Sequence, residues 1–119
     1  MMKEMPNKSG CAVETTLSVI GGTWKPIILF HLLILGKMRF MQLSRSIPSV
    51  TQRMLTLQLR ELEADGIVVR TIYPEVPPRV EYELTALGFS LQPLLEMMND
   101  WGKNYQEINE ISKNKMESQ

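Results

Sequence analysis

Residues 41–64, MQLSRSIPSVTQRMLTLQLRELEA, contain the pattern that decides the fold expected of this chain. A short helix is predicted over about 41–46, and it ends before Pro48 because the residue preceding a proline disfavours helical geometry. Thr51 is a favourable N-cap for a longer helix, which is predicted over Gln52–Ala64. Two helices joined by so tight a link are typical of a helix-turn-helix.

The flanking sequence predicts the rest of a winged version of this motif. Two helices precede it, over about 11–20 and 24–35, and a glycine pair separates them. The β-branched run 66–73 and the alternating run 79–84 predict two strands, which the proline-rich residues 74–78 join as a stiff loop. The expected fold class is therefore mostly α with a small β-hairpin (α+β), a winged helix-turn-helix with further helices at both ends.

A long apolar seam marks the last predicted helix, which Thr85 caps. The seam starts at Leu87 and Leu91, and its residues are spaced by four and three in turn, as in a heptad repeat. Pro93 lies off the seam and is expected to kink the helix or to split it.

The seam could simply be core, but it reaches beyond the core that so small a domain needs. We therefore expect the first and last helices to pair with a second copy of the chain. The residues expected in this homodimer contact are Val13, Leu17, Leu94, Met98, Trp101, Tyr105 and Ile108.

The chain has 119 residues, which make one small domain with room for one core. We expect that domain to occupy residues 11–112, between a mobile tail at 1–10 and a frayed tail at 113–119. The longest apolar stretch, residues 26–35, is too short to span a bilayer, and no leader-like segment opens the chain. The expected location is the cytoplasm, with no membrane contact.

The sequence offers little for catalysis or metal binding. One cysteine and one histidine exclude an internal disulfide framework and leave few ligands for a transition metal. His31 lies in the apolar second helix, where a satisfied core histidine is the expected role, and no nucleophile stands at a workable spacing from it. Gly21-Gly22 is too short to cradle a phosphate. We therefore expect no enzyme, no metal and no cofactor.

Charge is distributed unevenly along the chain, although its formal net charge is zero. From Thr15 to Arg60 there are six basic residues and no acidic one, whereas from Glu61 to Gln119 there are five basic and eleven acidic residues. A charge run is usually only a solvated face. A positive half on a neutral protein can also meet a polyanion, however.

The helix predicted over Gln52–Ala64 would present part of this positive charge on one outward face. Its leucines at 55, 59 and 62 share one arc, while an amide, two guanidiniums and a hydroxyl share another. Such groups can contact base edges in the major groove, although an ordinary solvated face is the alternative. The residues expected to contact bases are Gln52, Arg53, Thr56 and Arg60.

Further basic residues lie near this helix. Lys37, Arg39 and Arg45 are expected to hold phosphates of double-stranded DNA. Arg79 would serve the wing by contacting phosphate or a minor groove, unless it pairs with Glu75 or Glu81.

Three stretches carry a resemblance to a known family: CAVETTLSVIGGTWKPIIL (11–29), RFMQLSRSIPSVTQRMLTLQLRELEADGIV (39–68) and YPEVPPRVEYELTALGFSLQPLLEMMNDWG (73–102). They resemble the HxlR-type transcriptional regulators, a winged-helix group similar to MarR proteins. The resemblance implies a homodimer that binds promoter DNA, often in response to electrophiles, oxidants or other stress.

In several members of that family a cysteine near the N-terminus senses the stress, and Cys11 matches its position. Ala12 stands where the family commonly has proline, and Ser49 where its turn usually has glycine. Since the chain has no second cysteine, a disulfide would have to be intermolecular, or a small thiol or electrophile would modify Cys11. The other interpretation is that Cys11 acts as a small buried hydrophobe.

A different class of function also fits a winged helix: a protein-interaction module that does not bind DNA. The acid-free segment from Thr15 to Arg60 argues against this alternative. Sequence-specific DNA binding by a homodimeric transcriptional regulator is therefore the expected function.

Overall fold

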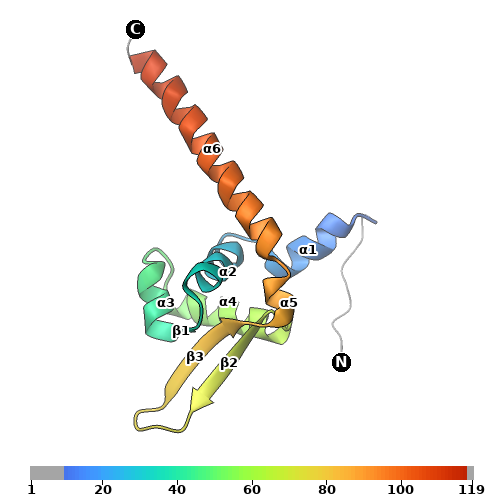
Figure 1. The fold of residues 1–119 in the computed structure, drawn as a ribbon, viewed down its shortest axis with the longest axis vertical. Coiled ribbons are helices and arrows are strands. Elements are labelled where there is room, and N and C mark those ends of the chain that lie inside the picture. The colour runs from blue at the N-terminus through green and yellow to red at the C-terminus, as the bar shows by residue number, and fades with distance from the viewer. Residues whose placement is uncertain (1–9, 118–119) are drawn as a thin grey trace.

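The computed structural model describes residues 10–117 of the chain (Figure 1). Apart from Gly10, the expected mobile tail lies outside the described residues, as do residues 118–119 of the expected frayed tail. The elements are, in chain order, α1 (Ala12–Ile20), α2 (Trp24–Leu35), β1 (Met38–Arg39), α3 (Phe40–Ser46), α4 (Gln52–Ala64), β2 (Val68–Tyr73), β3 (Arg79–Leu84), α5 (Ala86–Phe89) and α6 (Gln92–Glu117).

Helices α3 and α4 form the predicted helix-turn-helix. Thr51 caps α4, because its Oγ1 accepts a hydrogen bond from the backbone N–H of Met54 at 3.1 Å. Helix α3 begins one residue earlier than predicted. There the backbone N–H of Arg39 donates to Oε1 of Gln42 at 2.9 Å, which satisfies a donor at the start of the helix.

The sheet has three strands, so the predicted two-stranded hairpin is only part of it. The residues expected as an extended link supply β1, in which Met38 pairs with Tyr82 and Arg39 with Glu81. Strands β2 and β3 pair antiparallel, and the order in the sheet is β1-β3-β2. A two-residue strand is too short to show alternation in the sequence, which is why the prediction missed it.

The last helix is split rather than kinked. Helix α5 ends at Phe89 and α6 begins at Gln92. Pro93 therefore lies in the first turn of α6, where its missing N–H removes no helical hydrogen bond. Helix α6 continues to Glu117, so residues 113–117, which we expected to fray, are helical.

The core lies between α2, the helix-turn-helix and the sheet. The three leucines of α4 predicted to face inward are buried, which confirms the orientation of that helix. Helix α6 contributes a single buried side chain, Leu95. The largest fully buried side chains are Ile28, Leu29, Leu32, Leu43, Leu55, Leu59, Leu62 and Val68.

Helix α6 projects away from this core (Figure 1). Figure 1 shows it leaving the body on the side opposite the β2–β3 wing. The radius of gyration is 17.4 Å, and the principal extents are 62 × 42 × 24 Å. A compact chain of this length would have a radius of about 13.5 Å. The larger value reflects α6, most of which extends beyond the body formed by the other described elements.

Candidate nucleic-acid interface and dimer face

Two ion pairs lie on the two flanks of α4. On one flank, Glu61 of α4 accepts a hydrogen bond from Nζ of Lys25 in α2 at 2.9 Å. On the other flank, Glu63 lies 3.5 Å from Arg70 in β2. Since the buried leucines face the core, the face of α4 between these two ion pairs is turned to the solvent.

This outer face of α4 presents the side chains predicted to contact bases. Gln52, Arg53 and Arg60 are exposed, and Thr56 is half-buried. Within residues 10–117, neither Arg53 nor Arg60 forms an ion pair. Their guanidiniums are therefore available to phosphate or base oxygens.

Thr56 uses its hydroxyl within its own helix. Oγ1 of Thr56 donates to the backbone oxygen of Gln52 at 2.9 Å. While that hydrogen bond is made, the hydroxyl cannot also donate to a phosphate, although its lone pairs and its methyl group remain accessible.

The outer face of α4 also carries an apolar side chain that our sequence analysis did not single out. Leu57 is 50% exposed, between Arg53 one turn earlier and Arg60 one turn later. A helical wheel would have shown it, because Leu57 falls away from the arc shared by the three core leucines.

Two more accessible guanidiniums lie at the start and in the last turn of α3. Arg39, directly before α3, and Arg45, in its last turn, are both exposed. Neither forms an ion pair within the described part of the chain. Both line a groove of about 600 Å³ between α3 and the wing loop. The structure thus brings these two predicted phosphate ligands to one surface.

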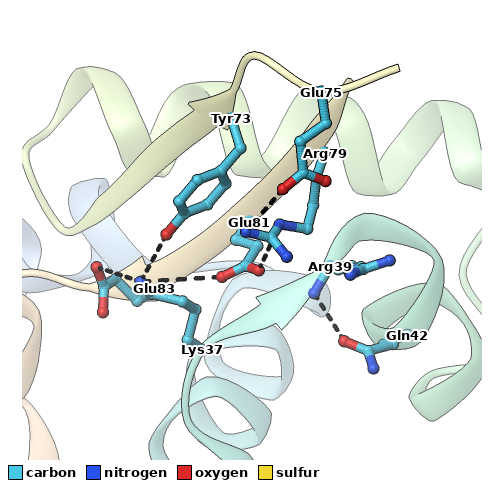
Figure 2. A network of polar contacts seen from close by, with 8 residues as sticks. All are labelled: Lys37, Arg39, Gln42, Tyr73, Glu75, Arg79, Glu81 and Glu83. Atoms are coloured by element: carbon cyan, nitrogen blue, oxygen red, sulfur yellow. Dashed lines mark hydrogen bonds and ion pairs between the residues drawn. The ribbon is translucent and has the colours of Figure 1, made fainter. Parts of the chain in front are cut away.

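Lys37 lies among polar side chains of the sheet, and Figure 2 shows it beside Tyr73, Glu81 and Glu83. Its Nζ donates to the hydroxyl of Tyr73 at 3.1 Å and lies 3.8 Å from carboxylate oxygens of Glu81 and Glu83. The hydrogen bond to Tyr73, helped by the two carboxylates, raises the pKa of Lys37 above its ordinary value. Lys37 therefore remains a cation, and the carboxylates of Glu81 and Glu83 offset its positive charge.

Arg79 forms the ion pairs that the sequence left as an alternative to a DNA contact. Its guanidinium lies 3.2 Å from Glu75 and 3.2 Å from Glu81 (Figure 2). It also stacks over the ring of Tyr73, 4.2 Å from the ring centroid. These contacts tie the end of the wing loop to the sheet, because they join residues on both sides of that loop.

The residues predicted to form the dimer contact are exposed on α1 and α6. Trp101 and Tyr105 stack on each other, with ring centroids 5.3 Å apart, and Trp101 is 69% exposed. The other members of this face, Val13, Leu17, Leu94, Met98 and Ile108, also leave a large part of their surface in solvent. We call these seven residues the dimer face, after the contact predicted for them. Ile111 continues it along α6.

His31 is only half-buried, in contrast to the core position expected for it. Its Nδ1–H donates to the backbone oxygen of Ile27 at 2.8 Å. The ring lines a groove of about 250 Å³ between α2 and α6, beside Leu95 and Met98. The side chain is satisfied, as predicted, but it borders the dimer face rather than the core.

Cys11 directly precedes α1 and is exposed, so the interpretation as a buried hydrophobe is wrong for this protomer. It stands next to the part of the dimer face formed by Val13 and Leu17. Across residues 10–117, no three side chains of the metal-ligating types converge. Nor is any single helix there long and apolar enough to cross a membrane; α1 and α2 meet that criterion only as a pair bent by 74°.

A helix-turn-helix with accessible guanidiniums, followed by a β-hairpin wing, defines a winged-helix DNA-binding protein. Comparison with known proteins narrows this class. The sequence profile of the HxlR-like helix-turn-helix family matches residues 19–110, and the chain belongs to that family of DNA-binding transcriptional regulators. This assignment confirms the resemblance found in the sequence.

Individual proteins similar to this chain are also transcriptional regulators. The chain is 57% identical over 103 residues to the HTH-type transcriptional regulator YybR of Bacillus subtilis (strain 168), covering 87% of this chain and 82% of YybR. It is 58% identical to the redox regulator HypR in its oxidized form, with a TM-score of 0.75, covering 79% of this chain and 96% of that one.

A MarR-family transcriptional regulator of Enterococcus faecalis V583 is more distant. It is 37% identical, with a TM-score of 0.70, covering 89% of this chain and 96% of that one. All three relatives are regulators rather than enzymes. The comparisons do not favour the alternative function, a protein-interaction module that does not bind DNA.

Proposed function

We propose that the chain binds operator DNA as a two-fold symmetric homodimer joined through the dimer face of α1 and α6. The exposed row of large apolar side chains supports this assembly, because contiguous apolar surface of this kind marks an interaction site. Two identical chains most often pair through the same patch on each, and the projecting α6 offers such a patch.

In this dimer the two α4 helices enter successive major grooves, about 34 Å apart. Gln52, Arg53, Thr56 and Arg60 face the base edges, while Arg39 and Arg45 contact phosphates on either side. Lys37 and Arg79 already have carboxylate partners, so we assign them to holding the wing in place. Since a regulator must reach chromosomal DNA, the proposed location is the cytoplasm.

The observation that carries this proposal is the set of four accessible arginines on α4, on α3 and directly before it, in a segment without an acidic residue. Phosphate contacts release counterions, so affinity must fall with salt. If Arg39 and Arg45 of both protomers hold one phosphate each, log K against log salt has a slope of about −3.6 or steeper.

Fluorescence anisotropy with a labelled operator fragment, captured by the protein from genomic DNA, measures this slope. A random duplex of equal length is the control. Retention of neither duplex at low salt would reject DNA binding and favour the interaction module.

A second proposal concerns regulation: Cys11 responds to an oxidant. Its exposure at the start of α1, beside the dimer face, supports this role, as does the similarity to the redox regulator HypR. A peroxide, its O–O bond breaking to release water or an alcohol, would oxidise one Cys11 thiol to a sulfenic acid. The thiol of a second Cys11 would then displace water from it, forming an intersubunit disulfide.

Wild type and Cys11→Ser, each with and without hydrogen peroxide, test this response. We expect peroxide to change the operator affinity of the wild type at least several-fold and to produce a covalent dimer on a non-reducing gel. Cys11→Ser should show neither effect. Equal peroxide responses of the two proteins would exclude Cys11 as the sensor.

A further inference from the structure

We propose that Leu57 determines part of the operator sequence by packing against the C5-methyl group of a thymine in the major groove. The inference rests on the proposed function, in which α4 occupies that groove. It assigns a specificity role to a side chain that has no hydrogen-bonding group.

Leu57 is exposed where the other leucines of α4 are not. Half of its surface is open to solvent, whereas Leu55, Leu59 and Leu62 are at most 1% exposed. The ion pairs that Glu61 and Glu63 make with α2 and β2 close the two flanks of the helix. Leu57 stands on the remaining face, so half of its side-chain surface is open to a partner from outside the protomer.

The immediate neighbours of Leu57 on this face indicate which partner it meets. Arg53 lies one turn before it and Arg60 one turn after it, and neither has an ion pair within residues 10–117. Two accessible guanidiniums around one leucine suit a polyanion with an isolated apolar group better than an apolar protein surface.

The floor of the major groove contains one such group. Adenine, guanine and cytosine present donors and acceptors along this edge, and only thymine adds a methyl group. A leucine packed against the polar edges would leave their hydrogen bonds unmade, which is costly. Against the thymine methyl it buries apolar surface on both sides, so Leu57 favours thymine and disfavours the other three bases at its position.

The rival side chain for the same methyl group is Thr56. Its hydroxyl donates to the backbone of Gln52 at 2.9 Å, and its methyl is the part left for an apolar contact. Leucine is the longer side chain, and Leu57 is exposed while Thr56 is half-buried, so Leu57 is better placed to contact a group beyond the helix surface. The experiment must therefore separate these two neighbours.

Replacing thymine with deoxyuridine removes the methyl group and keeps the hydrogen-bonding edge. Each thymine in one half of the captured operator is replaced in turn, and binding is measured for the wild type, Leu57→Ala and Thr56→Ser. Alanine is a stronger helix former at this exposed position, and circular dichroism verifies that the fold is retained. Thr56→Ser is the matched control, because it removes a methyl group and keeps the hydroxyl.

At one thymine we expect deoxyuridine to weaken wild-type binding about fourfold, the effect of one buried methyl group. Leu57→Ala should bind both duplexes equally there, and Thr56→Ser should keep the fourfold difference. Unchanged sensitivity in Leu57→Ala, loss of sensitivity in Thr56→Ser instead, or a wild type indifferent to every replacement would each overturn the inference and leave DNA binding intact. A wild type that retains no duplex at all would reject the proposed function and this inference together.

Discussion

Arg45 and Arg79 have the same side chain but opposite surroundings. Arg45 is exposed and lacks an ion pair among residues 10–117, whereas Arg79 contacts Glu75 and Glu81 at 3.2 Å each. We expect Arg45→Ala to lower operator affinity and to reduce the salt slope by about 0.9 per protomer, or about 1.8 per dimer. Arg79→Ala should leave the slope nearly unchanged, because its charge is already balanced. Anisotropy titrations from low to moderate salt measure both slopes.

The comparison between these two arginines has its own control. Arg45→Lys keeps the charge and should restore most of the slope that Arg45→Ala loses. A slope reduction in Arg79→Ala equal to that in Arg45→Ala would mean that Arg79 leaves its carboxylates to bind phosphate, contrary to the assignment made above.

The sequence shows which residues are basic, but it does not show which acidic or aromatic side chains contact them in the fold. It identified the arginines of α3 and α4, because an acid-free run is visible in the sequence itself. It could not decide between the two roles of Arg79, because Tyr73 and Glu81 approach it only when β2 and β3 pair. Leu57 gave no signal of function in the sequence, because a single apolar side chain among polar ones carries no hydrogen-bonding group that points to a DNA contact.

Elements whose limits depend on local chemistry were predicted well. A few adjacent residues determine each of three features: the Thr51 cap, the break at Pro48 and the proline-rich loop. The elements around them lie where they were expected. Strand β1 was missed for two reasons: two residues are too few to show alternation, and its pairing with β3 joins residues more than forty positions apart. The break between α5 and α6 was left open as a kink or a split, since Pro93 permits both.

The split between α5 and α6 has a consequence for the assembly. Thr85 Oγ1 donates to the backbone oxygen of Gly66 and accepts from the N–H of Gly88, so α5 is fixed to the end of β3 and to the residues before β2. Helix α6 can then leave the body in its own direction, as Figure 1 shows. A single unbroken helix would have carried the apolar seam along the direction of α5 instead.

The shape of the whole molecule leads us to expect that DNA binding depends on the proposed dimer. A protomer with a 26-residue α6 that buries one side chain has not completed its apolar packing. We expect Trp101→Glu to convert the dimer to monomers, because it places a charge at the stacked pair with Tyr105. If each copy costs about 2 kcal/mol as an interface hot spot, two copies weaken dimerisation roughly a thousandfold.

Sedimentation velocity over a range of protein concentrations measures the assembly, and the operator titration measures its effect on binding. Lys103→Glu is the matched control, since it adds negative charge to an exposed part of α6 outside the dimer face. The control should remain dimeric, while Trp101→Glu should lose operator affinity along with the dimer, because a single α4 helix engages only one half-site. Monomeric wild-type protein at micromolar concentration, or a Trp101→Glu variant that sediments as the wild type does, would show that the apolar face of α6 serves another purpose.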